Sequence, residues 1–101
     1  MTVLLSHGYF LEDDLKEQEI MKPYPPLGIL YISAWLKQHG ISCSVYDTTF
    51  SSKDAFRQHL IDQKPRLLAL YTNLMTKLNV LETIQFVRSR PELEDVIIVL
   101  G

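Results

Sequence analysis

Short apolar runs alternate with longer helix-like stretches along this chain, and this alternation constrains the fold more than any other feature. The runs that predict strands are Thr2–Ser6, Ile41–Tyr46, Leu67–Tyr71 and Val96–Leu100. The first and third are continuous, which is typical of strands buried on both faces. The second alternates apolar and polar residues, which indicates an edge strand with one wetter face. Repeated strand–helix–strand units predict right-handed βαβ connections and a parallel sheet.

The composition of the first predicted helix indicates how much of its surface must be covered by other parts of the protein. It begins at about Pro26, because the prolines before it keep the chain extended, and Gly40 ends it. Apolar side chains cover most of its circumference and leave only Ser33 and Lys37 as a narrow polar strip. We therefore expect this helix to be covered on two sides, by its own sheet and by something else.

Two more helices are predicted between the later strands. Ser51 and Asp54 resemble a capping box that opens a helix running through Lys64, with Pro65 as a stop. The next helix ends at Pro91. The side chains that we expect to face the core from these helices are Phe56, Leu60, Val80, Leu81, Ile84 and Val87.

This pattern favours an α/β fold of the flavodoxin-like (Rossmann-like) type, with a parallel sheet in the order 2-1-3-4. A binding crevice is then expected beyond Ser6–His7 and Tyr71–Thr72, where the strand order reverses. The fifth strand and last helix of that fold are absent, so we expect residues 1–101 to be one domain from the N-terminal part of a longer protein. The bare apolar run Val96–Leu100 suggests a homodimer formed through an exposed last strand.

Composition excludes several classes of function. The formal net charge is −2, and no cluster of basic and aromatic residues marks a nucleic-acid surface. Cys43 is the only cysteine, so this chain cannot form an internal disulfide or a cysteine-rich metal site alone, and a cytoplasmic setting is expected. We also expect no membrane span, because no apolar run is long enough.

The chain resembles the N-terminal cobalamin (B12)-binding domain of radical SAM enzymes, the group of anaerobic magnesium-protoporphyrin monomethyl ester cyclase and many methyltransferases. The resemblance covers nearly all residues and rests on three stretches: Pro25–Leu36 with Gly40, then Val45–Asp47, then Val96–Gly101. It implies that a corrin ring lies over the carboxyl ends of the strands. A downstream barrel domain, absent here, would hold a 4Fe-4S cluster and S-adenosylmethionine. The resemblance thus implies a cofactor-holding module that is not itself an enzyme.

The crevice and the resemblance together select a set of cofactor-binding candidates. B12 modules that ligate cobalt from below use Asp-x-His-x-x-Gly after the first strand, and the spacing around His7 departs from it, so we expect no metal ligand there. Gly28 would allow a flat ring to approach, or would allow the helix to pack tightly on its sheet. The candidates are Ser6, His7, Gly8, Tyr24, Pro25, Pro26, Leu27, Gly28, Thr72, Asn73, Leu74 and Gly101.

Other interpretations remain open. A flavin- or nucleotide-binding domain would use the same crevice, although the loop after the first strand is not rich in Ser, Thr or Gly. A docking domain without a ligand would use the apolar first helix as an interface. A phospho-acceptor receiver domain is disfavoured, because Tyr71–Thr72 stand where its aspartate should be. Asp47 is interpreted as a turn former, and Asn73 as a ligand contact, a helix N-cap or both.

Overall fold

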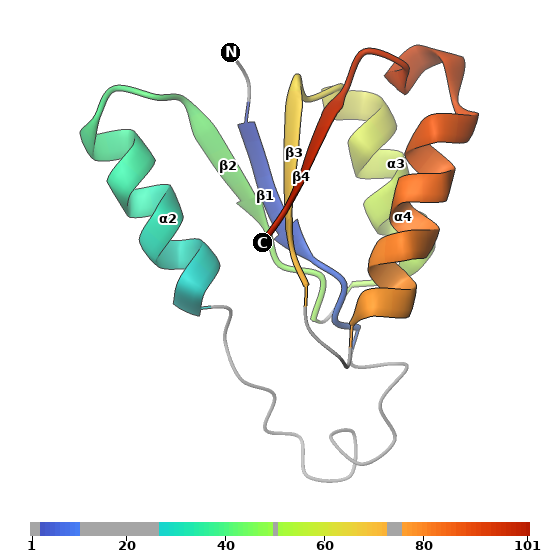
Figure 1. The fold of residues 1–101 in the computed structure, drawn as a ribbon, viewed down its shortest axis with the longest axis horizontal. Coiled ribbons are helices and arrows are strands. Elements are labelled where there is room, and N and C mark those ends of the chain that lie inside the picture. The colour runs from blue at the N-terminus through green and yellow to red at the C-terminus, as the bar shows by residue number, and fades with distance from the viewer. Residues whose placement is uncertain (1–2, 11–26, 50, 73–75) are drawn as a thin grey trace, which may run out of the picture.

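Four parallel strands form one sheet in the order β2-β1-β3-β4 in the computed structural model, which describes residues 3–10, 27–49, 51–72 and 76–101 (Figure 1). β1 pairs with β2 and β3, and β3 with β4, all in parallel. The predicted α/β class, the flavodoxin-like arrangement and the strand order are confirmed. The strands are β1 (Val3–His7), β2 (Cys43–Tyr46), β3 (Leu67–Tyr71) and β4 (Ile97–Leu100).

Helices cover the two faces of this sheet unequally. Helix α2 lies on one face, whereas α3 and α4 lie side by side on the other (Figure 1). α2 contacts β2 and β1. A short 3₁₀ helix, η2, follows α4 and leads into β4. The helices are α2 (Leu27–Gln38), α3 (Lys53–Gln63), α4 (Lys77–Ser89) and η2 (Pro91–Leu93).

Strand alternation divides the core into two parts. On the α3 and α4 face, Leu4, Leu68 and Leu70 pack with the helix residues Phe56 and Leu60 in the larger cluster. On the α2 face, a smaller cluster joins Val3, Leu5 and Ile29 to partly buried neighbours. β1 contributes to both clusters, so all five of its residues are buried, as its continuous apolar run predicts.

Helix α2 is oriented differently from the prediction. Ser33, assigned to the polar strip, is only 5% exposed, and its hydroxyl lies 3.5 Å from the Cys43 sulfur in β2. A small side chain there allows the helix to lie close to the strand. Tyr31 is 75% exposed, and the Trp35 ring stacks on His39 at the surface, with centroids 3.9 Å apart. Among the described residues, only the sheet covers this helix.

The later helices also differ from the prediction at single positions. Ser52, not Ser51, caps α3 by accepting a hydrogen bond from the N–H of Ala55. In α4, Leu81 is 49% exposed, and the buried position is taken by Thr83. The Thr83 hydroxyl donates to the carbonyl of residue 79 at 2.9 Å, which satisfies it inside the core.

The end of α2 follows the expected chemistry. Gly40 has φ = 75°, a conformation that glycine adopts without the steric cost of a Cβ. Its N–H donates to the carbonyl of Lys37, and the N–H of Ile41 donates to that of Leu36. In the part of the chain that the structure describes, no helix has the length and apolar character needed to cross a bilayer.

Candidate functional site at the carboxyl edge of the sheet

The carboxyl ends of β1 and β3 lie next to each other in register, with His7 opposite Tyr71. The strand order reverses at this point, since β1 connects onward to β2 on one side and β3 to β4 on the other. In open parallel sheets, the crevice outside such a reversal is the usual ligand-binding position. The candidate site is therefore built outward from His7.

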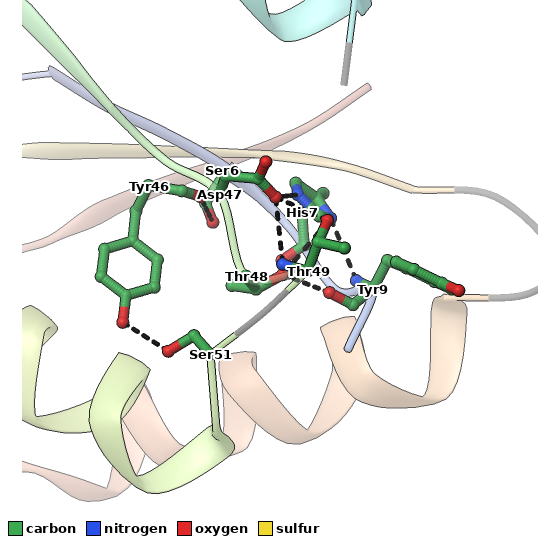
Figure 2. Close-up of polar contacts among 8 residues, drawn as sticks. All are labelled: Ser6, His7, Tyr9, Tyr46, Asp47, Thr48, Thr49 and Ser51. Atoms are coloured by element: carbon green, nitrogen blue, oxygen red, sulfur yellow. Dashed lines mark hydrogen bonds and ion pairs between the residues drawn. The ribbon is translucent and has the colours of Figure 1, made fainter. Parts of the chain in front are cut away.

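The His7 ring is held at both of its nitrogens (Figure 2). The backbone N–H of Tyr9 donates to Nδ1 at 3.1 Å, so the neutral ring carries its proton on Nε2. Nε2 lies 2.9 Å from Oδ1 of Asp47 and donates to it. Because the ring is buried and both nitrogens have protein partners, His7 is a fixed structural group and not an open metal ligand.

Asp47 anchors the turn that follows β2. Its Oδ1 accepts hydrogen bonds from the backbone N–H of Thr49 at 3.0 Å and from the Thr49 hydroxyl at 2.6 Å. Partial burial raises the pKa of the Asp47 carboxyl, but the hydrogen bonds from Thr49 and His7 outweigh this and lower the pKa below its ordinary value. The interpretation of Asp47 as a turn former is confirmed, and its bond to His7 adds a second role.

Two further hydroxyl groups join the ends of β1 and β2. Ser6 donates to the carbonyl of Tyr46 at 2.6 Å. Thr48 is fully buried, and its hydroxyl donates to the carbonyl of Tyr9. The floor of the site below the loop after β1 is thus a closed polar network whose groups bond to one another (Figure 2).

Gly8 brings this loop against the start of α4. A Cβ at this position would lie 2.9 Å from Cγ2 of Val80 and 3.1 Å from the carbonyl oxygen of Thr76. The Gly8 carbonyl accepts a hydrogen bond from the Asn79 side chain at 2.9 Å. Glycine is therefore required at position 8 by close packing.

Of the remaining candidates, Thr72, Gly28 and Gly101 lie nearer to solvent. Thr72 follows β3, and its N–H donates to the carbonyl of Gly101 at 2.7 Å, so the ends of β3 and β4 are joined. Gly28 lies in the first turn of α2, and a Cβ there would meet no atom within 4 Å. Among the described residues, nothing packs against position 28. Leu27 is the first residue of α2.

The other predicted residues cannot be placed. Tyr24, Pro25, Pro26, Asn73 and Leu74 lie outside the described residues. The structure therefore brings together Ser6, His7 and Gly8 at the end of β1, with Thr72 and Gly101 at the ends of β3 and β4. It also adds residues that the sequence did not select as part of this edge, namely Thr48 and Thr49. Their only signal was their position directly after Asp47 and the second strand.

A separate hollow of about 590 Å³ opens on the α2 face. Apolar residues of β1 and β3 form its floor, and Ile32 and Leu36 of α2 form one wall. It reaches the segment from Gly40 to Ser42, which precedes β2, so it extends toward the amino edge of the sheet. The hollow is thus distinct from the candidate site at the carboxyl edge.

In the described part of the carboxyl edge, the polar side chains of Ser6, His7, Asp47, Thr48 and Thr49 are hydrogen-bonded within the protein. Within the described ranges, His, Cys, Asp and Glu side chains do not form a group of three or more that would hold a metal ion. Scans of the chain against protein-family models, curated proteins and solved structures found no match.

Proposed function

We propose that this chain is a cobalamin-binding module of a radical SAM enzyme, which holds a corrinoid over the carboxyl ends of its parallel strands. The observation that carries this proposal is the reversal of strand order between β1 and β3, with no described atom within 4 Å of a Cβ built at Gly28, at the start of α2. A large flat cofactor needs a broad, unhindered shelf more than a deep cleft. The resemblance of the Pro25–Leu36 stretch to the cobalamin-binding domains supports the same assignment.

The described residues are compatible with a corrin in one further respect. A corrin would bring its own cobalt, so the protein need not provide a cluster of metal ligands. Both ring nitrogens of His7 already have protein partners, namely Asp47 and the Tyr9 N–H, so His7 would support the cofactor by its position. Ser6, His7 and Gly8 would instead form a rigid support, with Gly28, Thr72 and Gly101 at its rim.

On this proposal, the chain alone catalyses no reaction. A downstream barrel domain with a 4Fe-4S cluster and S-adenosylmethionine would carry out the chemistry, of methyltransferase or cyclase type, in the cytoplasm. The chain would position the corrinoid for that domain. Its partners are thus cobalamin and the barrel.

The test is a titration of the chain with hydroxocobalamin. Binding is measured from the change in the visible spectrum of the cofactor and, separately, by equilibrium dialysis. Saturable binding with a spectral change, and no comparable binding of flavin mononucleotide, supports the proposal. Failure to bind hydroxocobalamin by either method contradicts it. Saturable binding of the flavin alone would favour the nucleotide-binding alternative.

A docking domain is the second candidate, because α2 exposes aromatic side chains. Tyr31 and Trp35 lie on its outer surface, and the apolar hollow lies beside its inner surface. Contiguous exposed apolar groups often mark protein interaction sites. Replacing both aromatic residues by serine distinguishes the candidates, since it would abolish docking through this surface and leave corrinoid binding at the carboxyl edge intact.

A further inference from the structure

The two ring nitrogens of His7 play opposite hydrogen-bonding roles (Figure 2). Nε2–H donates to Oδ1 of Asp47 at 2.9 Å, and Nδ1 accepts the backbone N–H of Tyr9 at 3.1 Å. A backbone N–H can only donate, so Nδ1 carries no proton while this second bond exists. The bond between the ring and the loop after β1 therefore requires a neutral histidine.

Thr48 places an acceptor beside the same ring nitrogen. Its Oγ1 lies 3.3 Å from Nδ1 of His7, and its hydroxyl donates to the carbonyl of Tyr9. Because that hydroxyl proton is directed at the carbonyl, a lone pair of Oγ1 is available to accept from a protonated Nδ1. Thr48 is fully buried, so packing fixes its position. A doubly protonated ring thus has an acceptor for each N–H group, namely Asp47 and Thr48.

We propose that His7 is a pH-sensitive switch for the loop after β1, which the neutral ring holds and the protonated ring releases. A proton taken up from solvent turns Nδ1 from an acceptor into a donor, so Nδ1–H and the Tyr9 N–H would face each other as two donors. Nδ1–H then bonds to Thr48, and the peptide N–H of Tyr9 turns away from the ring. The bond between Nε2 and Asp47 is kept in both states.

The released peptide also connects the loop to α4. The carbonyl of Gly8 belongs to the same peptide group as the Tyr9 N–H, and it accepts from the Asn79 side chain at 2.9 Å. A peptide group is planar, so turning its N–H away from His7 also turns its carbonyl away from Asn79. Glycine on one side of the peptide eases this rotation. Phe10, which follows, is buried in the larger core cluster, so the change is confined to the peptide between residues 8 and 9.

The charged surroundings of the ring are compatible with this change. Asp47 contacts Nε2, and its pKa is lowered, so the carboxylate stays charged in mild acid and offsets the positive charge of the ring. By strand alternation His7 shares the α2 face of the sheet with Leu5, and Tyr71 lies opposite it on β3. The other titratable side chains of α2 and of the first turn of α4 are exposed, namely Tyr31, Lys37 and Lys77. Of these residue types, histidine is the one that ordinarily changes charge between about pH 5 and pH 8.

The test is an NMR titration of the ¹⁵N-labelled chain between about pH 8 and pH 5. The ring ¹⁵N signals show which nitrogens of His7 carry protons. The exchange rate of the Tyr9 amide, relative to its intrinsic rate at each pH, measures its protection. This protection should fall about tenfold or more as the ring gains its second proton, because the amide loses its acceptor. The side-chain amide signals of Asn79 should shift with the same midpoint. No cofactor is added, so the result does not depend on corrinoid binding.

The Thr49 amide is the internal control. It bonds to Asp47, whose carboxylate stays charged over this range, so its protection should not change. A ring of His7 that stays neutral to the end of the titration would overturn the proposal. So would a Tyr9 amide that stays protected after the ring is protonated, or a parallel loss of protection at Tyr9 and Thr49.

His7→Asn is the matched variant. Asparagine places an oxygen near the position of Nδ1 and takes up no proton between about pH 5 and pH 8, so the Tyr9 amide keeps an acceptor. Its protection should therefore be the same at both ends of the titration, and a pH-dependent loss in this variant would contradict the switch. Circular dichroism checks that the variant folds, and the titration of the native chain decides the question if it does not.

Discussion

Nε2 of His7 lies 2.9 Å from Oδ1 of Asp47, and this bond joins the ends of β1 and β2 across forty residues of sequence. The two residues stand at the carboxyl edge, where the candidate site is built. His7 is buried and Asp47 is partly exposed, so the bond links the core to the surface turn. The pair thus fixes the end of β1 to the turn that follows β2.

Replacing Asp47 by alanine should destabilise the chain by about 1–2 kcal/mol. The change removes the acceptor for both Thr49 donors and leaves the buried Nε2–H of His7 without its partner. Urea unfolding followed by circular dichroism measures the loss. Asp62→Ala is the control, because Asp62 is an exposed helix residue bonded only to the Gln58 side chain among the described contacts, and it should change stability by less than about 0.5 kcal/mol. Equal losses would contradict the role given to Asp47.

The stabilisation by Asp47 should depend on pH. Its pKa is lowered in the folded chain from the ordinary value of 3.8, so the folded state favours the charged carboxylate. This stabilisation is fully present above the unfolded pKa and is lost as the pH falls through the folded pKa. The difference in unfolding free energy between the native chain and Asp47→Asn should therefore be large at neutral pH and shrink as the pH falls below about 4. A difference that stays constant or grows in acid would contradict the argument.

Two glycine substitutions should act in opposite directions. Gly8→Ala should destabilise the chain by about 1–3 kcal/mol, because its Cβ would collide with Val80 and the Thr76 carbonyl. Gly28→Ala should stabilise it by about 0.5–1 kcal/mol, because the Cβ would meet no described atom within 4 Å and alanine favours a helix. Thermal and urea unfolding measure both changes. A loss of stability in Gly28→Ala would show that position 28 is packed.

A bulky side chain at position 28 should block corrinoid binding without damaging the fold. Gly28→Phe projects an aromatic ring into the space beside the first turn of α2 and should weaken hydroxocobalamin binding about tenfold or more. Ala34→Phe is the matched control, since Ala34 is also exposed but lies six residues, about 9 Å, further along the helix. Equal affinities in the two variants would place the corrinoid elsewhere.

Much of the fold follows from local sequence chemistry. The continuous run that became β1 and the alternating run that became β2 are enough to predict which strand is central and which lies at an edge. Gly40 and Pro65 mark helix ends because glycine permits the left-handed backbone that ends a helix and proline cannot continue one. These features act over a few residues, so a single sequence reveals them.

The sequence predictions were wrong where tertiary contacts determine which side of a helix is buried. Ser33 reads as a polar surface residue, but its small size lets α2 approach β2, and the helix rotates to bury it. The sequence pattern predicts that Leu81 faces the core, but Thr83 is the buried residue. The Thr83 hydroxyl can be buried because it donates a hydrogen bond within the helix. Periodicity gives the width of an apolar face but not its orientation when that face covers most of a helix.

The network at the carboxyl edge was only partly predictable for a similar reason. Asp47 followed by threonines indicates a turn, because an aspartate can accept from residues just after it. Its bond to His7 depends on the parallel pairing of β1 and β2, which brings distant residues together. The sequence thus predicts which residues lie at the edge, and the pairing determines which of them bond.

The most direct measurement is an amide ¹H–¹⁵N spectrum of the chain before and after addition of hydroxocobalamin, whose low-spin cobalt(III) is diamagnetic. The account predicts chemical-shift changes at Gly8, Gly28, Thr72 and Gly101, at the carboxyl edge, and none at Gly40 or Ser42, which border the apolar hollow near the amino edge. Unchanged spectra, or changes confined to Gly40 and Ser42, would contradict it.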